Sequence, residues 1–329
     1  MEISEQIKIE TDQIYQKVSK VVPEIEWAFH APLIHKINML KKQKNAVVLA
    51  HNYQTPEIYH GIADIATDSL ALAVEASKTE ADIIVLCGVH FMAETAKLMN
   101  PEKKVLIPDM SAGCSLASSI TGEDVRMLKE KYPGVPVVSY VNTSAEVKAE
   151  TDICCTSANA VKVVESLGVD KVIFLPDYYL ANYVQKNTKV KIISWQGTCI
   201  VHEKFTAKEI EDIRKENPDI KIIAHPECPP DVISASDFAG STSNMVEYVK
   251  ENQPKKVLLV TECTMSDNVQ VENPNVKFIK PCNLCPYMNK ITLQKIYDCL
   301  ENESNEIKIS HNIATMARKS VQRMTAIGR

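Results

Sequence analysis

Three cysteines occupy the same place in a repeating pattern, and thiolates are good ligands for iron–sulfur clusters and for zinc. Cys114, Cys199 and Cys285 lie 85 and 86 residues apart. Each follows the start of an apolar run by nine residues and precedes a threonine by seven: the runs begin at Val105, Val190 and Val276, and the threonines are Thr121, Thr206 and Thr292. Among ten cysteines a near-even triple can arise by chance, but the matching flanks indicate a threefold internal duplication with one ligand in each repeat.

Three converging thiolates would hold an iron–sulfur cluster and leave one iron open to substrate. Zinc bound by three cysteines is the alternative that the spacing leaves open. Cys282 has no counterpart in the other repeats, so we treat it as accessory. Cys87 lies inside an apolar run, where we expect it to be buried.

Polar side chains follow the first strand that we expect in each repeat. They form the groups His51-Asn52-Tyr53, Tyr140-Val141-Asn142 and His225-Pro226-Glu227. In parallel α/β sheets, ligands bind beyond the carboxyl ends of the strands, so we expect these groups to meet at one shared site. A lone histidine would more often be structural, but the threefold placement favours a functional role.

A second set of polar residues stands at the expected start of the helix before the second strand of each repeat. These residues are Asp68 and Ser69, Ser157, and Thr242. Any one of them could simply be an N-cap, but three helix N-termini directed at one region would bind an anion. None of the five arginines lies in a strand-end motif. We therefore expect a small, multiply anionic substrate held largely by hydroxyls and backbone amides.

The elements that position these residues predict an α/β fold. Each repeat has the pattern strand, loop, helix, strand, helix, strand; in the second repeat we expect strands at 137–140, 171–175 and 190–195 and helices at 158–167 and 176–185. Strands that are apolar throughout and alternate with helices indicate parallel sheets covered on both faces. We expect three α/β/α units arranged about a pseudo-threefold axis.

The same pattern divides the chain. We expect an N-terminal helical segment over 1–45, a first repeat over 46–115 that is completed by C-terminal helices over 286–329, a second repeat over 116–200 and a third over 201–285. The basic residues Arg318, Lys319 and Arg323 are interpreted as a solvated helix face.

Composition excludes several classes of function. A hydrophobic content of 45% and a charged content of 24% are typical of a globular protein with a sizeable core. The net charge of −5 argues against nucleic-acid binding, and no Rossmann or P-loop glycine motif occurs. The chain has no signal-peptide pattern and no membrane-length apolar run. We therefore expect a cytoplasmic protein, in which thiols serve metals or catalysis more often than disulfides.

Short stretches along essentially the whole chain together resemble one enzyme family, quinolinate synthase, the iron–sulfur enzyme of de novo NAD biosynthesis. The stretches are Ala50-His51-Asn52-Tyr53-Gln54, Asp68-Ser69-Leu70, Gly113-Cys114-Ser115-Leu116, Ser139-Tyr140-Val141-Asn142-Thr143-Ser144, Thr156-Ser157-Ala158-Asn159-Ala160, Cys199-Ile200-Val201-His202, His225-Pro226-Glu227-Cys228, Gly240-Ser241-Thr242-Ser243-Asn244-Met245 and Cys285-Pro286-Tyr287-Met288. Some relatives carry C-x-x-C-x-x-C near the third ligand; here only Cys282 and Cys285 are present.

The resemblance implies condensation of iminoaspartate with dihydroxyacetone phosphate to quinolinate, with loss of phosphate and two waters. It also implies that Cys114, Cys199 and Cys285 bind a [4Fe-4S] cluster whose open iron is a Lewis acid. Seven residues would hold the carboxylates and the phosphate: His51, Ser69, Tyr140, Asn142, Ser157, His225 and Thr242. Tyr53, His202 and Glu227 are the candidates for proton transfer, with Glu227 the strongest as a base or as a contact to the substrate nitrogen.

Two other functions stay open at this point. Another dehydratase acting on a dicarboxylate through an open iron would use the same cysteines, and a non-catalytic iron–sulfur sensor would keep only the cluster. The polar strand ends and the lack of an effector domain argue against a sensor. The expected partners are the two substrates and an aspartate-oxidising enzyme that hands over iminoaspartate, with no nucleic acid and no membrane.

Overall fold

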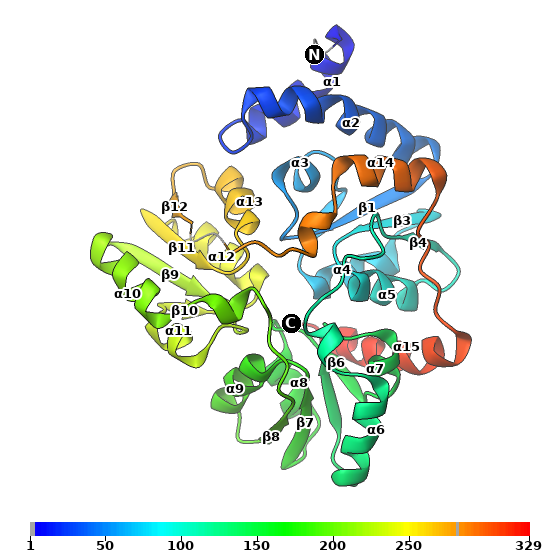
Figure 1. The fold of residues 1–329 in the computed structure, drawn as a ribbon, viewed down its shortest axis with the longest axis vertical. Helices are drawn as coiled ribbons and strands as arrows, with labels where there is room; N and C mark the ends of the chain where they lie inside the picture. Colours follow the sequence, from blue (N-terminus) through cyan, green and yellow to red (C-terminus); the bar gives the residue numbers. More distant parts are fainter. Residues whose placement is uncertain (1–3, 281–282) are drawn as a thin grey trace.

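Two helices precede the first sheet. The computed structural model describes residues 4–280 and 283–329, and in it α1 (Glu5–Val18) and α2 (Glu24–Gln43) lie along one end of the molecule (Figure 1). The buried residues of α2 are spaced three or four apart, which places them on one face: Trp27, Ala31, Ile34 and Ile37. This face packs α2 against the first sheet and α14 (Leu293–Asn302).

Three four-stranded parallel sheets follow, with equivalent strand orders. The first has the order β2-β1-β3-β4 and consists of β1 (Ala46–His51), β2 (Ile65–Thr67), β3 (Ile83–Cys87) and β4 (Lys104–Leu106). The second has the order β6-β5-β7-β8 and consists of β5 (Val137–Tyr140), β6 (Ile153–Cys155), β7 (Lys171–Leu175) and β8 (Lys191–Ser194). The third has the order β10-β9-β11-β12 and consists of β9 (Ile220–Ala224), β10 (Phe238–Ala239), β11 (Lys256–Val260) and β12 (Lys277–Ile279).

The prediction of parallel sheets covered on both faces is confirmed. In the third sheet, successive residues of each strand enter different apolar clusters: Ile222 and Leu258 lie in one cluster, whereas Ile223 and Leu259 lie in the other. Side chains of a strand alternate between the two faces, so both faces of this sheet are covered. This explains why the strands are apolar at consecutive positions.

The structure contains one short edge strand in each sheet that the sequence pattern did not predict. These strands are β2, β6 and β10, and they have three, three and two residues. Such lengths are too short to produce a readable alternation or an apolar run. The central strands β5 and β7 have the expected bounds, and β8 is shorter than expected at both ends.

Helices connect the strands of each unit along the sequence. Those of the first unit are α3 (Pro56–Tyr59), α4 (Ser69–Lys78) and α5 (His90–Met99). Those of the second are α6 (Gly122–Lys131), α7 (Ala145–Ala149), α8 (Ala160–Ser166) and α9 (Tyr178–Asn187). The third unit has α10 (Ala207–Glu216), α11 (Pro230–Ala235), α12 (Thr242–Asn252) and α13 (Thr264–Glu272), and α15 (His311–Ile327) follows α14.

The same local structure follows each of the three evenly spaced cysteines. A short 3₁₀ turn begins three residues after the cysteine, over Ala117–Ser119, His202–Lys204 and Met288–Lys290. The threonine seven residues after the cysteine is the N-cap of the next helix; the capped helices are α6, α10 and α14. Its hydroxyl accepts a hydrogen bond from the backbone N–H three residues later, at 3.2–3.3 Å in the three copies. The constant spacing of seven residues between each cysteine and its threonine therefore spans one 3₁₀ turn and ends at the N-cap of the next helix.

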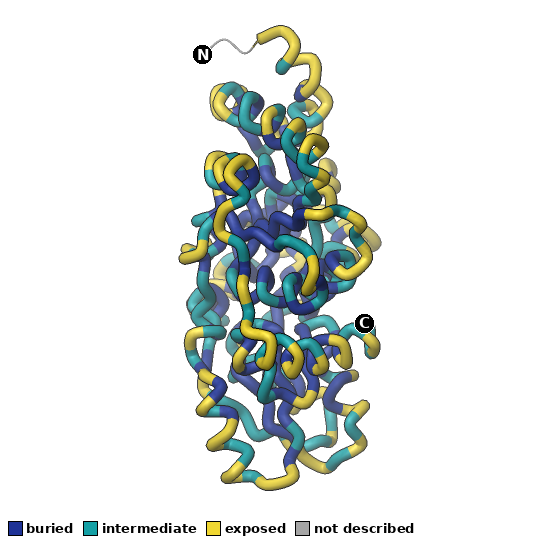
Figure 2. Tube along the Cα trace, turned by 90° about the vertical axis from the view of Figure 1, so that its right-hand side faces the viewer, coloured by how far each residue is buried: buried dark blue, intermediate teal, exposed yellow. Residues whose placement is uncertain are grey.

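The three sheets surround a common centre, and the chain ends near it (Figure 1). Figure 2 shows buried segments running through the interior of the molecule and exposed segments along its outside. Helix α15 packs against α7 and β6 of the second unit and against α5 of the first. Two basic residues of α15 bind backbone carbonyls, Arg318 that of Leu98 and Arg323 that of Asp152. Arg318 is half-buried, so the interpretation of this stretch as only a solvated face is wrong for that residue, whereas Lys319 and Arg323 are exposed as expected. No helix in the described part of the chain is long and apolar enough to cross a membrane.

Candidate active site

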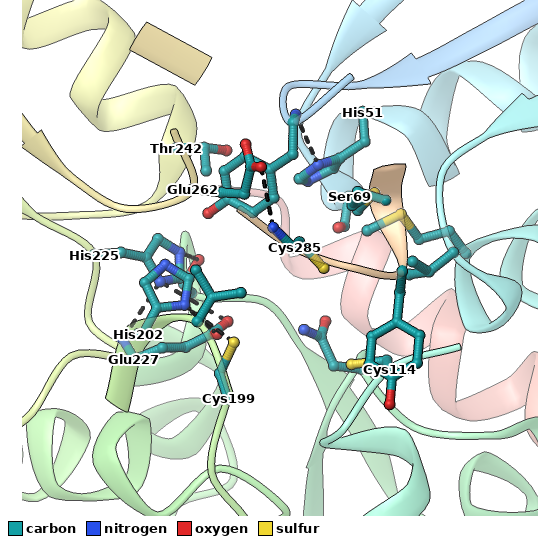
Figure 3. A pocket seen from close by; sticks show the side chains of 18 of the residues that line it. His51, Ser69, Cys114, Cys199, His202, His225, Glu227, Thr242, Glu262 and Cys285 are labelled. Atoms are coloured by element: carbon teal, nitrogen blue, oxygen red, sulfur yellow. Dashed lines mark hydrogen bonds and ion pairs between the residues drawn. The ribbon is translucent and has the colours of Figure 1, made fainter. Parts of the chain in front are cut away.

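One cavity at the centre of the molecule is lined by residues from all three units. All the expected site residues except Asn52 line it, and they include the strand ends, the helix starts and the three cysteines (Figure 3). Asn52 is buried nearby and donates a 2.9 Å hydrogen bond to the hydroxyl of Thr242. Cys282 lies outside the described residues. The carboxyl ends of β1, β5 and β9 thus meet as the parallel topology requires.

The three cysteines present their sulfur atoms to this cavity in equivalent settings. At each one, the backbone N–H groups two and three residues later donate to the sulfur: Leu116 and Ala117 to Cys114, Val201 and His202 to Cys199, and Tyr287 and Met288 to Cys285. These donors belong to the 3₁₀ turns described above. Burial nevertheless raises the pKa of Cys114 to about 12 and raises the pKa of Cys199 and Cys285. Such thiols become thiolates when a metal displaces their protons.

This donor set fits an iron–sulfur cluster. Three sulfur ligands, each with N–H donors directed at it, are the groups that hold such a cluster and set its potential. The Oδ1 atom of Asn142 also lines the cavity wall, buried and without a hydrogen-bond partner, so it is available to a bound group. Cys87, by contrast, is fully buried in β3, as expected.

Glu227 is the centre of a buried polar network beside Cys199. Its Oε2 atom lies 3.0 Å from His202 Nδ1, and its Oε1 atom accepts a 2.5 Å hydrogen bond from the Tyr140 hydroxyl. Burial acts to raise the pKa of Glu227, but the nearby imidazoles of His202 and His225 and the hydrogen bonds from His202 and Tyr140 outweigh it and hold the pKa below its ordinary value. Glu227 is therefore an ionised carboxylate inside a buried polar network.

His202 joins this carboxylate to the first and third units. Its Nδ1 atom also lies 3.2 Å from the sulfur of Cys199, and its Nε2 atom lies 2.9 Å from the hydroxyl of Thr261. The Thr261 hydroxyl is 2.6 Å from the hydroxyl of Tyr53. A continuous chain of hydrogen-bonding groups thus runs from Tyr53 through Thr261 and His202 to Glu227. The atoms of Cys199, His202 and Glu227 also lie within 4.8 Å of one another, close enough to bind a single metal ion.

Burial shifts the pKa values of two tyrosines, Tyr53 and Tyr140, and of two histidines, His51 and His225. It lowers the pKa of His51 to about 4 and that of His225 to about 3, against the smaller opposing effect of nearby carboxylates. It raises the pKa of Tyr53 and Tyr140, with the charge of Glu227 adding to the effect. At neutral pH these four side chains are therefore uncharged hydrogen-bonding groups.

The helix starts do not all match the expectation. Asp68 is the N-cap of α4 with Ser69 as its first residue, and Thr242 is the first residue of α12, whose N-cap is Ser241. Ser157 is not at a helix start, because α8 begins at Ala160 with Asn159 as its N-cap. The Ser157 hydroxyl still reaches the cavity and lies 3.2 Å from His225 Nε2. A turn over residues 157–159 ahead of α8 accounts for the two-residue shift of the helix start from 158 to 160.

Two further residues of the cavity wall, Glu262 and Tyr287, are not among the site residues expected from the sequence. Glu262 follows β11, and its Oε1 atom accepts a 3.2 Å hydrogen bond from the backbone N–H of Cys285 while Oε2 accepts from Thr264. Burial raises its pKa. Tyr287 also lines the cavity. A signal for Glu262 is present in the sequence, since Thr261 and Glu262 directly follow the apolar strand β11, just as the expected polar groups follow the first strand of each repeat.

The chain is similar over most of its length to one group of proteins. A protein-family profile described as "Quinolinate synthetase A protein" matches residues 35–326. The quinolinate synthase of Sinorhizobium medicae (strain WSM419) is 60% identical over 315 residues, which cover 96% of this chain and 88% of that protein. The quinolinate synthase of Xylella fastidiosa (strain 9a5c) is 61% identical over 294 residues, which cover 89% of this chain and 87% of that protein.

Proposed function

The chain belongs to the quinolinate synthase family, and on that basis we propose how its own residues carry out the reaction. It is an enzyme of NAD biosynthesis, a transferase that forms quinolinate. The proposed substrates are iminoaspartate and dihydroxyacetone phosphate, which combine with loss of phosphate and two waters. The observation that carries the proposal is the convergence of three equivalent N–H···S cysteines and a buried carboxylate on one cavity.

We propose that Cys114, Cys199 and Cys285 hold a [4Fe-4S] cluster. When bound through three cysteines, such a cluster supplies one open iron that acts as a Lewis acid on a substrate oxygen or nitrogen. Zinc bound by the three cysteines is the alternative, and metal analysis of anaerobically purified protein distinguishes the two.

Hydrogen-bond donors around the cavity are proposed to bind the anionic groups of both substrates. Backbone N–H groups donate to the Nδ1 atoms of His51 and His225, at 3.2 and 3.3 Å. In the neutral ring the proton is then on Nε2, and in His225 that atom faces Ser157. The remaining binding groups are the side chains of Ser69, Tyr140, Asn142 and Thr242, all of which line the cavity. Neutral donors bind carboxylate and phosphate oxygens and release the product more readily than buried arginines would.

The proton transfers are assigned to the hydrogen-bonded chain from Glu227 to Tyr53. Glu227 is the base that removes a proton from the condensing substrate, because His202 and Tyr140 keep it ionised. Tyr53 stays protonated because burial raises its pKa, so it donates a proton to a departing hydroxyl. Thr261 and His202 then carry a proton between the two ends, and the base and acid are restored for the next elimination.

We further propose a cytoplasmic location and a transient encounter with an aspartate-oxidising enzyme. An imine of aspartate hydrolyses in water, so short exposure between the two enzymes preserves it. The unit boundaries at 46, 116 and 201 are proposed as the limits of the three repeats, since each range contains one complete sheet.

The test is anaerobic reconstitution of the cluster followed by addition of both substrates. Formation of quinolinate, identified chromatographically and by mass, is the expected result. A protein that carries the cluster, shown by its absorbance and iron content, but forms no quinolinate contradicts the proposal. A different product from a dicarboxylate would indicate an alternative dehydratase.

A further inference from the structure

Asp68 places a carboxylate in the wall of a cavity that receives anions. Its side chain is 7% exposed, and the residue lines the cavity beside Ser69. The Oδ1 atom accepts a 2.8 Å hydrogen bond from the backbone N–H of Ala71 and so caps α4. The negative charge of Asp68 reaches the neighbouring His51, where it acts to raise the pKa against the larger effect of burial. A dicarboxylate or phosphate bound nearby would experience the same negative charge.

Arg329 binds the other oxygen of this carboxylate from behind the cavity wall. Its Nη2 atom lies 3.0 Å from Asp68 Oδ2 and 3.1 Å from the hydroxyl of Ser243. The Ser243 hydroxyl also donates a 2.5 Å hydrogen bond to Asp68 Oδ2. Arg329 Nη1 lies 3.7 Å from the exposed carboxylate of Glu247. Both oxygens of Asp68 are thus occupied by protein groups, so its side chain is not free to bind substrate directly.

The segment that carries Arg329 is anchored on the second unit. The side-chain amide of Asn159 donates a 2.9 Å hydrogen bond to the carbonyl of Gly328. The ammonium group of Lys162 donates to the carbonyls of Ile327 and Arg329, at 3.1 and 2.6 Å. Arg329 therefore connects α8 of the second unit to α4 of the first and α12 of the third. Figure 1 shows the chain end at this central position.

The other four arginines have partners elsewhere. Arg126 pairs with Glu150 and Arg214 with Asp237, while Arg318 and Arg323 bind the carbonyls of Leu98 and Asp152. Among the five arginines, Arg329 is thus the one whose charge is placed against a wall residue of the cavity. A guanidinium group suits this position because it donates to a carboxylate and to a hydroxyl at the same time.

We propose that Arg329 is a positioning residue of the substrate site: it neutralises Asp68 and holds its carboxylate against Ser243, so that Ser69 and Thr242 meet anionic substrate groups without an uncompensated negative charge between them. This inference rests on the proposed function, because it requires anionic ligands in the cavity. It also explains why the N-cap of α4 can be the acidic residue Asp68 although the N-terminus of this helix faces an anion.

A double-substitution series tests the charge effect. The variants are Arg329→Gln, Asp68→Asn and the two combined, with Arg323→Gln in the preceding helix α15 as the matched control. Asparagine remains a good N-cap, so α4 keeps its start. The dissociation constant of quinolinate is measured by calorimetry on cluster-loaded protein, and KM for dihydroxyacetone phosphate and kcat are measured alongside.

The proposal expects Arg329→Gln to weaken quinolinate binding and raise KM by about five- to tenfold, the effect of one partly screened charge near the ligand. It expects kcat to stay within about twofold, since Arg329 does not touch the reacting atoms. Adding Asp68→Asn to Arg329→Gln restores affinity to within about twofold of wild type, because the uncompensated charge is then gone. Arg323→Gln leaves all three quantities at their wild-type values.

Two results would overturn the role of Arg329. One is unchanged affinity in Arg329→Gln; the other is a double variant that binds no better than Arg329→Gln, which would indicate a purely structural tether. Failure of the proposed function gives a different result: the loaded wild-type enzyme forms no quinolinate, whereas the calorimetric series still reports whether the charge of Asp68 controls dicarboxylate binding.

Discussion

His51 and His225 accept the same hydrogen bond in two different units: each Nδ1 atom receives the backbone N–H of the residue two positions later, Tyr53 in one case and Glu227 in the other. The two histidines follow β1 and β9, which are equivalent strands. This arrangement fixes both rings and leaves each Nε2–H for a partner in or beside the cavity. Both rings are buried, so protonation of either one is opposed.

The first prediction concerns stability against pH. Burial lowers the pKa of His51 to about 4 and of His225 to about 3, below the unfolded value of about 6.5. Between these values the unfolded chain binds more protons than the folded one, so stability is complete above pH 6.5 and falls as the pH is lowered toward 4. We expect the thermal midpoint to decrease between pH 7 and pH 5. His225→Gln, which keeps a donor but does not titrate, should show a smaller decrease; an equal slope would contradict the assignment.

The second prediction concerns the cluster ligands. Cys114→Ala, Cys199→Ala and Cys285→Ala should each abolish the visible absorbance of the reconstituted cluster, because no other described sulfur occupies an equivalent turn. Cys87→Ala is the matched control, since Cys87 is fully buried in β3 away from the turns. Iron and sulfide analysis measures the effect. Equal cluster loss in Cys87→Ala would refute the ligand assignment.

The third prediction concerns the proton path through Thr261. Replacing its hydroxyl in Thr261→Val interrupts the connection between Tyr53 and His202, which both lie within 2.9 Å of that oxygen. We expect kcat to fall by about tenfold or more, as for the loss of an acid–base contribution, with normal cluster absorbance and little change in KM. Thr261→Ser retains the hydroxyl and should recover most of the rate. Wild-type turnover by Thr261→Val would exclude the path.

The fourth prediction concerns the helix caps that follow the cysteines. Thr206→Ala removes the hydroxyl that accepts from Glu209 N–H and leaves the capping box of α10 incomplete. The expected loss of unfolding free energy is about 1 kcal/mol, measured by denaturant titration. Thr206→Ser should retain most of the stability. Thr292→Ala should cost less, because α14 has lysine at the third position and no capping box; the reverse order would contradict this account.

The sequence predicts most of the fold because the central strands are consecutive apolar runs with polar ends. Tyr140 and Glu227 could be assigned to one site because equivalent strands place them there. The edge strand β10 could not be predicted, because two residues carry no periodicity.

Two features of the site depend on distances that the sequence does not encode. Ser157 lies in a turn before α8 rather than at its start, and the length of such a turn follows from local packing. Arg329 reaches Asp68 across 261 positions of sequence, and no strand-end motif indicates that contact. Strand-end motifs therefore do not indicate the contribution of Arg329, which lies two residues beyond the last helix.

The repeated turn after Cys114, Cys199 and Cys285 also bears on how the protein is made in the cell. In the proposed assignment each ligand comes from a different unit, so a cluster bound by all three cysteines would be complete only after the third unit has left the ribosome and all three sheets have docked. Only a completely synthesised and folded chain could then bind the cluster through all three cysteines. A truncated product that ends before Cys285 would lack the visible absorbance of the cluster and would be more easily degraded by proteases.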